Sequence, residues 1–577
     1  MISNNQIAKI LREISAYLEM KDVPFKPRAY EKVAGIIEGL EEELAQTYQK
    51  KGEKAFFEIP GVGDSIAQKL EELIKTGKLK YYEQLKKEIP VDLEALMQIE
   101  GLGPKKIKKL YQELNIRNLK DLEKAVAEKK IRNLEGFGEK SEENILKGIE
   151  FLKKSGGRFV LGFEMALIKD IAARLSKLKE VKRLVVAGSV RRKKETIGDV
   201  DILIVSEKPK KVMDYFVSLP EVINVFSHGE TKSSVKIKNG LDIDLRVVPE
   251  NSYGAALNYF TGSKEHNVAL RELALKKGYK LNEYGLFKGE KQIAGETEEE
   301  IYEKLGMDYI EPEMRENTGE IELAKNHQLP KLIGYNDLKG DLQVQTNWTD
   351  GMNSIEEMAQ TAKDLGLLYI AITDHSKHLA MAHGLDEKRL LKQIEEIDKL
   401  NSKFSSPGGE KNFKILKGIE CDILKDGRLD LDENVLKKLD IVGASIHSYF
   451  NLSAQEQTQR MKKAMAHPEV DIIFHPTGRI INRRPPYEID MEEIIAFAKK
   501  TGTVLEIDAY PDRLDLKDEY IRKCVEAGVK MSIDSDAHSS QHFAYLEYGI
   551  AQARRGWATK NDIINAWPLD KMLKMLK

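Results

Sequence analysis

The stretch of sequence that decides the fold is residues 184–205, LVVAGSVRRKKETIGDVDILIV. Its apolar beginning predicts a buried strand, and its apolar end predicts another, which starts with Asp199 and Asp201. Side chains two residues apart on a strand lie on the same face, so the two carboxylates point the same way. Without a partner they would repel each other and the pKa of one would rise, whereas a divalent cation would hold both.

The loop between these two strands carries groups that bind phosphate. Gly188 and Ser189 offer backbone N–H groups and a hydroxyl to phosphate oxygens, and Arg191 or Arg192 can neutralise their charge. Gly198 directly precedes the second strand. Phosphate-binding groups, an arginine and a metal-holding pair of aspartates are the parts that transfer of a nucleotidyl group requires.

A second pair of aspartates follows in residues 235–248, VKIKNGLDIDLRVV. Asn239 and Gly240 predict a hairpin turn, after which Asp242 and Asp244 lie on one face of a strand. In a sheet this strand could lie beside the strand that carries the first pair. Either pair alone is explained as well by a solvated strand end, but the two pairs and the Gly-Ser turn together favour a metal site.

The bulk composition limits the classes of protein to consider. A chain of 577 residues is long enough for three to five compact units. Two cysteines give no disulfide framework and no thiolate zinc site, and a net charge of −2 does not by itself indicate nucleic acid. The sequence has no signal-like apolar start and no apolar run of about 18 residues. We therefore expect a soluble cytoplasmic protein that does not bind a membrane. We also expect it to be a monomer.

Three short segments repeat one pattern, in which a hydrophobic residue, any residue, glycine, a hydrophobic residue and glycine precede a helix. They are IPGVG at 59–63, IEGLG at 99–103 and LEGFG at 134–138. Such a turn presents backbone N–H groups at a helix N-terminus, where a DNA phosphate can bind whatever the base sequence. One copy would be explained as well by simple helix capping. Three copies favour helix-hairpin-helix DNA binding through the glycine pairs Gly61 and Gly63, Gly101 and Gly103, and Gly136 and Gly138.

The C-terminal part alternates apolar strands with amphipathic helices, which predicts a barrel-like α/β domain. The expected strands are 368–372, 413–417, 441–445, 472–474, 504–507 and 530–533. Histidines and carboxylates follow several of these strands, at the end where α/β barrels place their chemistry. The candidate ligands for zinc, manganese or iron are Asp350, Asp374, His375, Glu420, His447, His475, Asp536 and His538.

The motifs of residues 188–201 and 242–246 resemble the palm of the family X DNA polymerases, and NYFTGS at 258–263 resembles their thumb. The resemblance implies that Asp199, Asp201 and Asp244 are catalytic and bind Mg²⁺ or Mn²⁺. It implies that dNTPs contact Arg158, Gly188, Ser189, Arg192, Gly198, Tyr259, Phe260, Gly262 and Asn267. It also implies that gapped or primer-template DNA contacts Lys232, Arg246, Arg271 and Tyr284. For the Tyr-Phe pair, plain core packing is the commoner use of aromatic residues.

The first helical segment resembles the lyase domain of this family, in which a lysine forms a Schiff base with an abasic sugar. Lys69 occupies the corresponding position. Two neighbouring positions where the family pattern has basic residues are Ser65 and Tyr81 here. Lys69 is therefore a lyase candidate, with an ordinary exposed lysine as an equally good interpretation.

The C-terminal half resembles the PHP phosphoesterase domain, which in this family is similar to a 3′–5′ exonuclease with a trinuclear metal site. The family pattern has His-x-His where this chain has Gln343 and Gln345. An amide oxygen is a weak ligand compared with imidazole. We therefore expect Mn²⁺ or Zn²⁺ at partial occupancy and weak exonuclease activity, with a retained inactive scaffold as the alternative.

The expected fold is a multidomain α+β and α/β protein with helical helix-hairpin-helix units, a nucleotidyltransferase palm and thumb, and a PHP distorted β/α barrel. The expected segments are 1–90 (lyase-like), 91–150 (fingers-like), 151–249 (palm), 250–318 (thumb), 319–337 (linker) and 338–577 (PHP). The expected activity is that of a polymerase filling short gaps in DNA repair. The alternatives are a non-catalytic DNA-binding scaffold, an untemplated nucleotidyltransferase, and a PHP phosphoesterase as the main activity.

Overall fold

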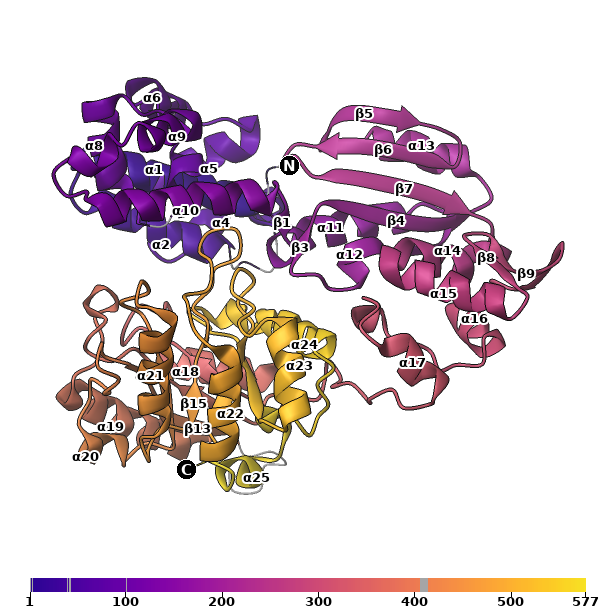
Figure 1. The fold of residues 1–577 in the computed structure, drawn as a ribbon. Helices are drawn as coiled ribbons and strands as arrows, with labels where there is room; N and C mark the ends of the chain where they lie inside the picture. The colour runs from indigo at the N-terminus through magenta and orange to yellow at the C-terminus, as the bar shows by residue number, and fades with distance from the viewer. Residues whose placement is uncertain are drawn as a thin grey trace. The chain divides into compact units, whose positions relative to one another are not determined.

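The computed structural model describes residues 2, 4–38, 40, 43–99, 101–404 and 413–576 (Figure 1). Contacts divide the chain into two compact units. Unit 1 contains Met1–Arg158 and the short segment Ile480–Pro486. Unit 2 contains Phe159–Arg479 and Tyr487–Lys577, and so includes the palm, the thumb and the C-terminal barrel.

Unit 1 is helical. Its helices are α1 (Asn4–Met20), α2 (Lys26–Glu38), α3 (Leu44–Lys51), α4 (Lys54–Phe57), α5 (Asp64–Thr76), α6 (Lys80–Glu88), α7 (Leu93–Met97), α8 (Pro104–Leu114), α9 (Leu119–Ala127) and α10 (Glu139–Ser155), with a 3₁₀ turn at Ile131–Asn133. Each glycine repeat leads directly into a helix. Its last glycine, Gly63, Gly103 or Gly138, is the N-cap residue of α5, α8 or α10.

The palm is a five-stranded sheet in the order β2-β4-β7-β6-β5. Its elements are β1 (Phe159–Val160), α11 (Leu161–Ser176), β2 (Val181–Val186), α12 (Gly188–Arg191), β3 (Thr196–Ile197), β4 (Asp199–Ser206), α13 (Pro209–Val217), β5 (Val222–His228), β6 (Lys232–Ile237) and β7 (Asp242–Val248). The short strands β1 and β3 form a separate antiparallel pair.

The alternation of residues along β4 assigns its two faces. Val200, Ile202 and Ile204 pack in the core that also contains residues of α11 and α13. Leu203 lies on the opposite face, where it packs with Ala256 and Leu257 of α14 (Tyr253–Thr261). Because Asp199 and Asp201 alternate with the core residues, they belong to the face that α14 covers.

The thumb continues with α15 (Lys264–Lys276), the three-stranded sheet of β8 (Lys280–Asn282), β9 (Gly285–Lys288) and β10 (Lys291–Ala294), and α16 (Glu298–Lys304). Short 3₁₀ turns lie at Glu250–Ser252 and Pro312–Met314. The expected polar linker at 319–337 instead contains α17 (Glu320–Lys325) and buries Leu332 and Ile333 in two different hydrophobic cores. Apolar side chains within a polar stretch were enough to fold it.

The C-terminal domain is built on a parallel sheet with the order β11-β12-β13-β14-β15-β16-β17. Its strands are β11 (Gly340–Val344), β12 (Tyr369–Ile372), β13 (Lys414–Asp422), β14 (Ile441–Ser445), β15 (Ile472–Ile473), β16 (Val504–Asp508) and β17 (Met531–Asp534). Its helices are α18 (Ile355–Asp364), α19 (Glu387–Phe404), α20 (Glu433–Leu436), α21 (Ala454–Met465), α22 (Met491–Thr501), α23 (Asp518–Ala527), α24 (Leu546–Arg555) and α25 (Leu569–Leu573), with 3₁₀ turns at Ala380–Ala382, Ser540–Tyr545 and Ile564–Ala566.

The first and last strands of this sheet meet. Val344 forms a parallel bridge with Ala537, and the Gln345 N–H donates to the Ala537 carbonyl at 2.8 Å. The sheet is therefore a nearly closed barrel, which confirms the predicted fold class. All six expected strands are present, with bounds that differ by up to five residues. The seventh, β11, was not among the expected strands.

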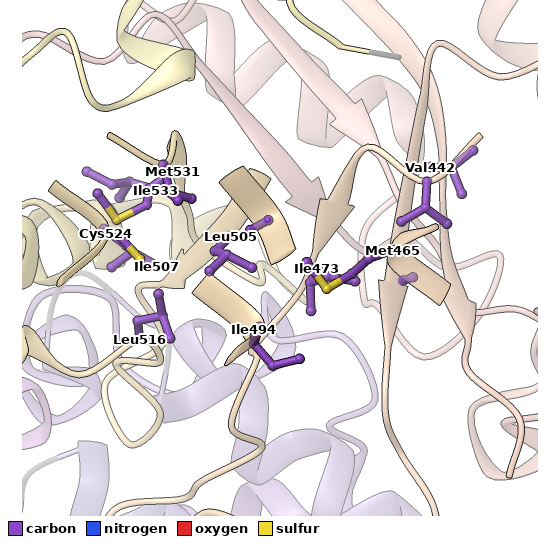
Figure 2. Close-up of a cluster of buried hydrophobic side chains, with 14 of the residues drawn as sticks. Val442, Met465, Ile473, Ile494, Leu505, Ile507, Leu516, Cys524, Met531 and Ile533 are labelled. Atoms are coloured by element: carbon purple, nitrogen blue, oxygen red, sulfur yellow. The ribbon is translucent and has the colours of Figure 1, made fainter. Parts of the chain in front are cut away.

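The largest hydrophobic core lies between the barrel strands and the outer helices. Figure 2 shows its side chains, among them Ile507 of β16, Ile533 of β17 and Cys524 of α23. Both cysteines are buried and free. Among the residues described, no helix is long and apolar enough to cross a membrane.

Candidate active sites

The palm carboxylates are brought together by strand pairing. Strands β4 and β7 are parallel neighbours, and their register places Asp199 opposite Asp242 and Asp201 opposite Asp244. Ile243 and Leu245 of β7 pack in the palm core, so Asp244 lies on the opposite face, the same face as Asp201. The predicted neighbour relation between the two strands is confirmed.

Asp201 lies at the centre of this carboxylate group. Burial, followed by repulsion from Asp199 and then from Asp244, raises its pKa to about 6. Gly188 has a φ of +61°, so a side chain there would strain the backbone, and its Cβ atom would have to displace the Asp201 carboxylate. A group of carboxylates with unneutralised charge is the donor set that Mg²⁺ or Mn²⁺ takes, so the residues present fit such an ion.

The two aspartates of β7 have different partners. The Lys236 ammonium lies 2.6 Å from a carboxylate oxygen of Asp242, whereas the Lys232 ammonium lies 3.5 Å from Asp244. Asp242 is thus paired closely with its neighbour on β6, whereas Asp244 has the looser contact. Among the described residues, the groups of three or more ligand atoms within 4.8 Å of one another do not include the palm carboxylates.

The two arginines of the loop have different surroundings. The Arg191 guanidinium donates to both carboxylate oxygens of Glu298, at 3.0 and 2.6 Å, and to the Thr261 hydroxyl at 2.6 Å. It therefore holds the palm to the thumb. Arg192 donates through Nε to Glu316 at 3.2 Å and through Nη1 to the Thr261 carbonyl. The Ser189 hydroxyl of the same loop is buried and has no hydrogen-bond partner within the part of the chain that the structure describes.

The thumb residues implied by the resemblance also lie near one another. The rings of Tyr259 and Phe260 meet edge to face at 5.1 Å, and the Arg246 guanidinium lies 4.5 Å from the Phe260 ring centroid. The Asn267 amide donates to the Tyr259 carbonyl at 2.7 Å, and the Arg271 Nε donates to the Asn267 carbonyl at 3.3 Å. Gly262 has a φ of +68° and lies against Arg192, and Tyr284 is 57% exposed. Gly198 directly precedes β4.

The three glycine repeats of unit 1 have the same backbone geometry. The first glycine of each, Gly61, Gly101 and Gly136, has a φ of +89°, +79° and +81°. In each turn the residue between the two glycines donates its N–H to the carbonyl of the first residue of the repeat, at 3.0 to 3.1 Å. The three turns therefore have the same backbone conformation and each is followed by a glycine N-cap, which agrees with the prediction that all three bind in the same way.

Lys69 of α5 lies in the same unit. Its ammonium donates to the Ser65 carbonyl and hydroxyl, both at 2.9 Å, and lies 5.0 Å from the Tyr81 ring centroid. Burial, and then the charge of Lys26, lower its pKa, which favours a nucleophilic amine. The lyase assignment stays a prediction. Arg158 is the last residue before β1 and belongs to unit 1.

The barrel carries two groups of ligand atoms at the carboxyl ends of its strands. One is Asp350, His375 and His538, and the other is His375, Glu420 and His447, each with its atoms within 4.8 Å of one another. Of the other candidates, His475 lies 2.9 Å from Glu420 through Nε2, and Asp536 is 4% exposed at the end of β17. Imidazole and carboxylate donors in these groups fit Mn²⁺ or Zn²⁺.

Glu420 is the common partner of this site. Its carboxylate lies 3.2 Å from His375 Nδ1 and 3.1 Å from His447 Nε2, and it accepts from Gln345 Nε2 at 2.8 Å. The side chain of Gln343, two residues earlier on β11, is buried, and neither of its amide atoms has a hydrogen-bond partner among the residues that the structure describes. The two glutamines thus face the interior of the barrel. Gln345 donates an N–H to the Glu420 carboxylate, whereas Gln343 has no such contact with a described residue.

Electrostatics agree with this arrangement. Burial opposes protonation of His447, but Glu420 and then Asp422 raise its pKa to about 9. Burial likewise opposes protonation of His538, but Asp536 and Asp350 raise its pKa to about 10, and the pKa of Asp350 falls to about 2 despite burial. In each case an acidic group stabilises a positive charge, as expected where a cation would bind.

Sequence reasoning missed the residues that support these ligands. Asp422 accepts from His447 Nδ1 at 2.9 Å, and Glu506 accepts from the His475 backbone N–H at 2.5 Å. Arg513 Nε lies 3.5 Å from Asp536. The carboxylates were visible as acid pairs two residues apart at strand ends. Asp374, a candidate ligand, instead accepts hydrogen bonds from Thr346, Thr349 and Gln393, so it holds the loop after β11.

The fold and the two sites define a nucleotidyltransferase palm joined to a metal-dependent phosphoesterase barrel, and sequence comparison agrees. Matches are found to the DNA polymerase beta palm (164–239) and thumb (256–316), the PHP domain (341–542), a helix-hairpin-helix domain (2–79) and a SAM-like helix-hairpin-helix tandem (93–150).

Relatives match either the whole chain or one part of it. The chain is 38% identical to the DNA polymerase/3'-5' exonuclease PolX of Bacillus subtilis (strain 168), over 99% of both chains. DNA polymerase lambda of Rattus norvegicus is 28% identical over 45% of this chain and 48% of its own length. A protein named "Probable phosphatase" of Thermoanaerobacter sp. (strain X514) is 32% identical over 37% of this chain and 84% of its own length. The chain belongs to the family X DNA polymerases that carry a PHP domain, which confirms the resemblance.

Proposed function

We propose that the palm and thumb fill short gaps in DNA during repair, adding nucleotides from dNTPs to a primer under the direction of a template. The observation that carries this proposal is the parallel register of β4 and β7, which sets Asp201 beside Asp244 at the Gly188 turn. Helix-hairpin-helix turns in unit 1 supply contacts to the DNA backbone.

The residues of the site divide the work. Asp199, Asp201 and Asp244 would hold two Mg²⁺ or Mn²⁺ ions, which would supply the chemistry that lowers the pKa of the primer hydroxyl and neutralises charge at the α-phosphate. Asp244 accepts the primer proton, because it lies on the separate strand. Ser189 and Arg192 bind the β- and γ-phosphates, and Tyr259 and Phe260 pack against the sugar.

Primer extension tests this assignment. Asp244→Ala should reduce extension of a gapped substrate by several orders of magnitude while the affinity for the same DNA stays within about twofold, because the carboxylate acts in the transition state. Asp242→Ala is the matched control, since Asp242 lies on the same strand and pairs with Lys236. Full extension by Asp244→Ala would overturn the assignment, and an inactive wild-type protein that still binds gapped DNA would favour the scaffold alternative.

We propose further that the PHP site acts on 3′ ends of DNA but is a weak exonuclease. The two groups of ligand atoms support metal binding, whereas the contact of Gln345 with Glu420 supports impairment. The Gln345 amide N–H donates to the Glu420 oxygen that a cation would otherwise bind. Gln343 offers no basic nitrogen as a ligand.

Restoring the imidazoles tests the impairment. The double substitution Gln343→His with Gln345→His should raise the bound Mn²⁺ per chain and increase Mn²⁺-dependent degradation of single-stranded DNA by at least about tenfold. Gap filling should not change. The bound metal is counted directly, and His447→Ala in both backgrounds is the control. Equal metal content and equally fast degradation by the two forms would contradict the proposal.

A further inference from the structure

A chain of ion pairs links the nucleotide site of the palm to the PHP domain. Its central group is the carboxylate of Glu316, the last residue of the matched thumb segment. One oxygen of Glu316 accepts from Arg192 Nε at 3.2 Å and from Arg555 Nη1 at 3.1 Å. Arg555 is the last residue of α24 in the PHP domain, and its side chain is only 3% exposed.

Arg555 also contacts the backbone of the nucleotide-binding loop. Its Nη1 donates to the Arg192 carbonyl at 3.0 Å, and its Nη2 donates to Asp518, the first residue of α23, at 2.6 Å. One buried guanidinium therefore fixes the main chain at Arg192, the carboxylate that holds the Arg192 side chain, and a second helix of the barrel. Buried charge-assisted hydrogen bonds of this kind hold groups in place.

The result is a defined orientation of the Arg192 guanidinium. Nε is held by Glu316 and Nη1 by the Thr261 carbonyl, while Nη2 has no hydrogen-bond acceptor among the residues that the structure describes. The fixed side chain can then direct this amino group at an anion. The positive charge of Arg192 also lowers the pKa of Asp201, against the larger effect of burial. The two groups are therefore close enough to interact.

The charges around Glu316 leave a positive surplus for a ligand. Arg192, Arg555 and Lys194 all face this one carboxylate, Lys194 at 3.8 Å. Asp518 neutralises Arg555 from the other side. Burial and then Arg555 lower the pKa of Lys194, which agrees with an excess of positive charge. Without Arg555, Glu316 would neutralise Arg192 more fully and the loop would lose its backbone anchor.

We infer that Arg555 of the PHP domain is a positioning residue for polymerisation, which orients Arg192 toward the triphosphate of the incoming dNTP. The inference rests on the proposed role of Arg192. It gives the PHP domain a part in nucleotide binding that does not depend on its own metal site.

Single-nucleotide insertion into gapped DNA by the full chain tests the inference. Arg555→Gln should raise the KM for dNTP about five- to twentyfold, with kcat and the affinity for DNA within about twofold, since the lost interaction acts on ligand binding. Arg555→Lys should recover part of the loss. Asp518→Asn, which removes only the distal anchor, should raise KM less. Glu547→Gln is the matched control, because Glu547 lies on the same helix and pairs with Lys193, 2.7 Å away, rather than with Arg192.

A double-mutant cycle separates positioning from general destabilisation. Arg192→Ala should raise KM, and adding Arg555→Gln to it should raise KM no further, because Arg555 acts through Arg192. An unchanged KM in Arg555→Gln, or additive effects in the double variant, would refute the inference alone. An unchanged KM in Arg192→Ala would refute the proposed role of Arg192, and the inference with it.

Discussion

At the scale of single residues, the polymerase site depends on a carboxylate under electrostatic strain. Asp201 is partly buried beside Asp199 and Asp244, and a side chain at Gly188 would have to displace its carboxylate. The ionised carboxylates therefore destabilise the metal-free folded protein at the place where a divalent ion would bind.

Because the repulsion acts only on the ionised carboxylate of Asp201, the stability of the folded protein should depend on pH. The pKa of Asp201 is about 6 in the folded protein and near 3.8 when unfolded, so metal-free stability falls as pH rises from about 4 to 6 and stays low above. In EDTA at pH 8, Asp201→Asn should raise the free energy of unfolding by up to roughly 3 kcal/mol. The gain should shrink toward pH 4.

Thermal unfolding of both forms at these pH values, in EDTA and in Mg²⁺, is the measurement. Mg²⁺ should stabilise the wild type and narrow the difference, because it binds only the folded carboxylate group. Asp242→Asn, whose carboxylate is already paired with Lys236, should show no such gain. A gain that is the same at both pH values would argue against the repulsion described here.

At the scale of elements, the glycine turns are the smallest units with a function. In each, a glycine with positive φ turns the chain and a second glycine caps the next helix. A Cβ at Gly101 would meet only the Lys106 ammonium, at 4.0 Å, so a substitution there strains the backbone without crowding the interior.

Gly101→Val should therefore weaken binding to gapped DNA about three- to tenfold, equally for different base sequences, because the lost contacts are to phosphate. Gly77→Val is the control. Gly77 ends α5 with a φ of +68° and equally open surroundings, but it belongs to none of the three glycine repeats, and the helix that follows it, α6, has Leu79 rather than a glycine as its N-cap residue. Fluorescence anisotropy over a range of salt concentrations measures both. Equal loss of affinity in the two variants would mean that backbone strain alone is responsible.

At the scale of the whole molecule, unit 2 is joined by side chains that cross from the PHP domain into the polymerase. Trp557, which follows α24, is 5% exposed and packs in the core of the thumb. Tyr548 packs against the palm core, and Arg554 donates to Glu313 at 2.8 Å. The barrel thus completes the cores of the two polymerase domains.

Trp557→Ala should consequently destabilise the thumb although the substitution lies in the PHP domain. Removing a buried tryptophan typically costs about 3–5 kcal/mol, and here the cavity would open in the thumb core. Limited proteolysis should cut residues 250–318 faster. Trp567→Ala, at a tryptophan that packs in the barrel, is the control and should leave thumb cleavage unchanged. Equal cleavage rates in all forms would show that the thumb is independent of the PHP domain.

The sequence by itself determined the chemistry and the local structure. The DVD and DID pairs, the Gly-Ser turn and the three glycine repeats predicted their strands and turns because side-chain alternation and glycine conformation are local properties. The histidines and carboxylates after successive barrel strands were predicted for the same reason, since parallel strands bring their carboxyl ends together. Gln343 and Gln345 were visible as a departure without any coordinates.

Tertiary structure alone decided which of these groups interact. Arg191 and Arg192 are neighbours with the same chemistry, yet Arg191 binds Glu298 and Arg192 binds Glu316, because partners over 100 residues away in the chain select between them. Asp374 became a loop anchor, and the segment at 319–337 became a packed part of two cores. The bonds of Arg555 depend on how α24 packs on the palm, and long-range packing of this kind leaves no periodic pattern in a sequence.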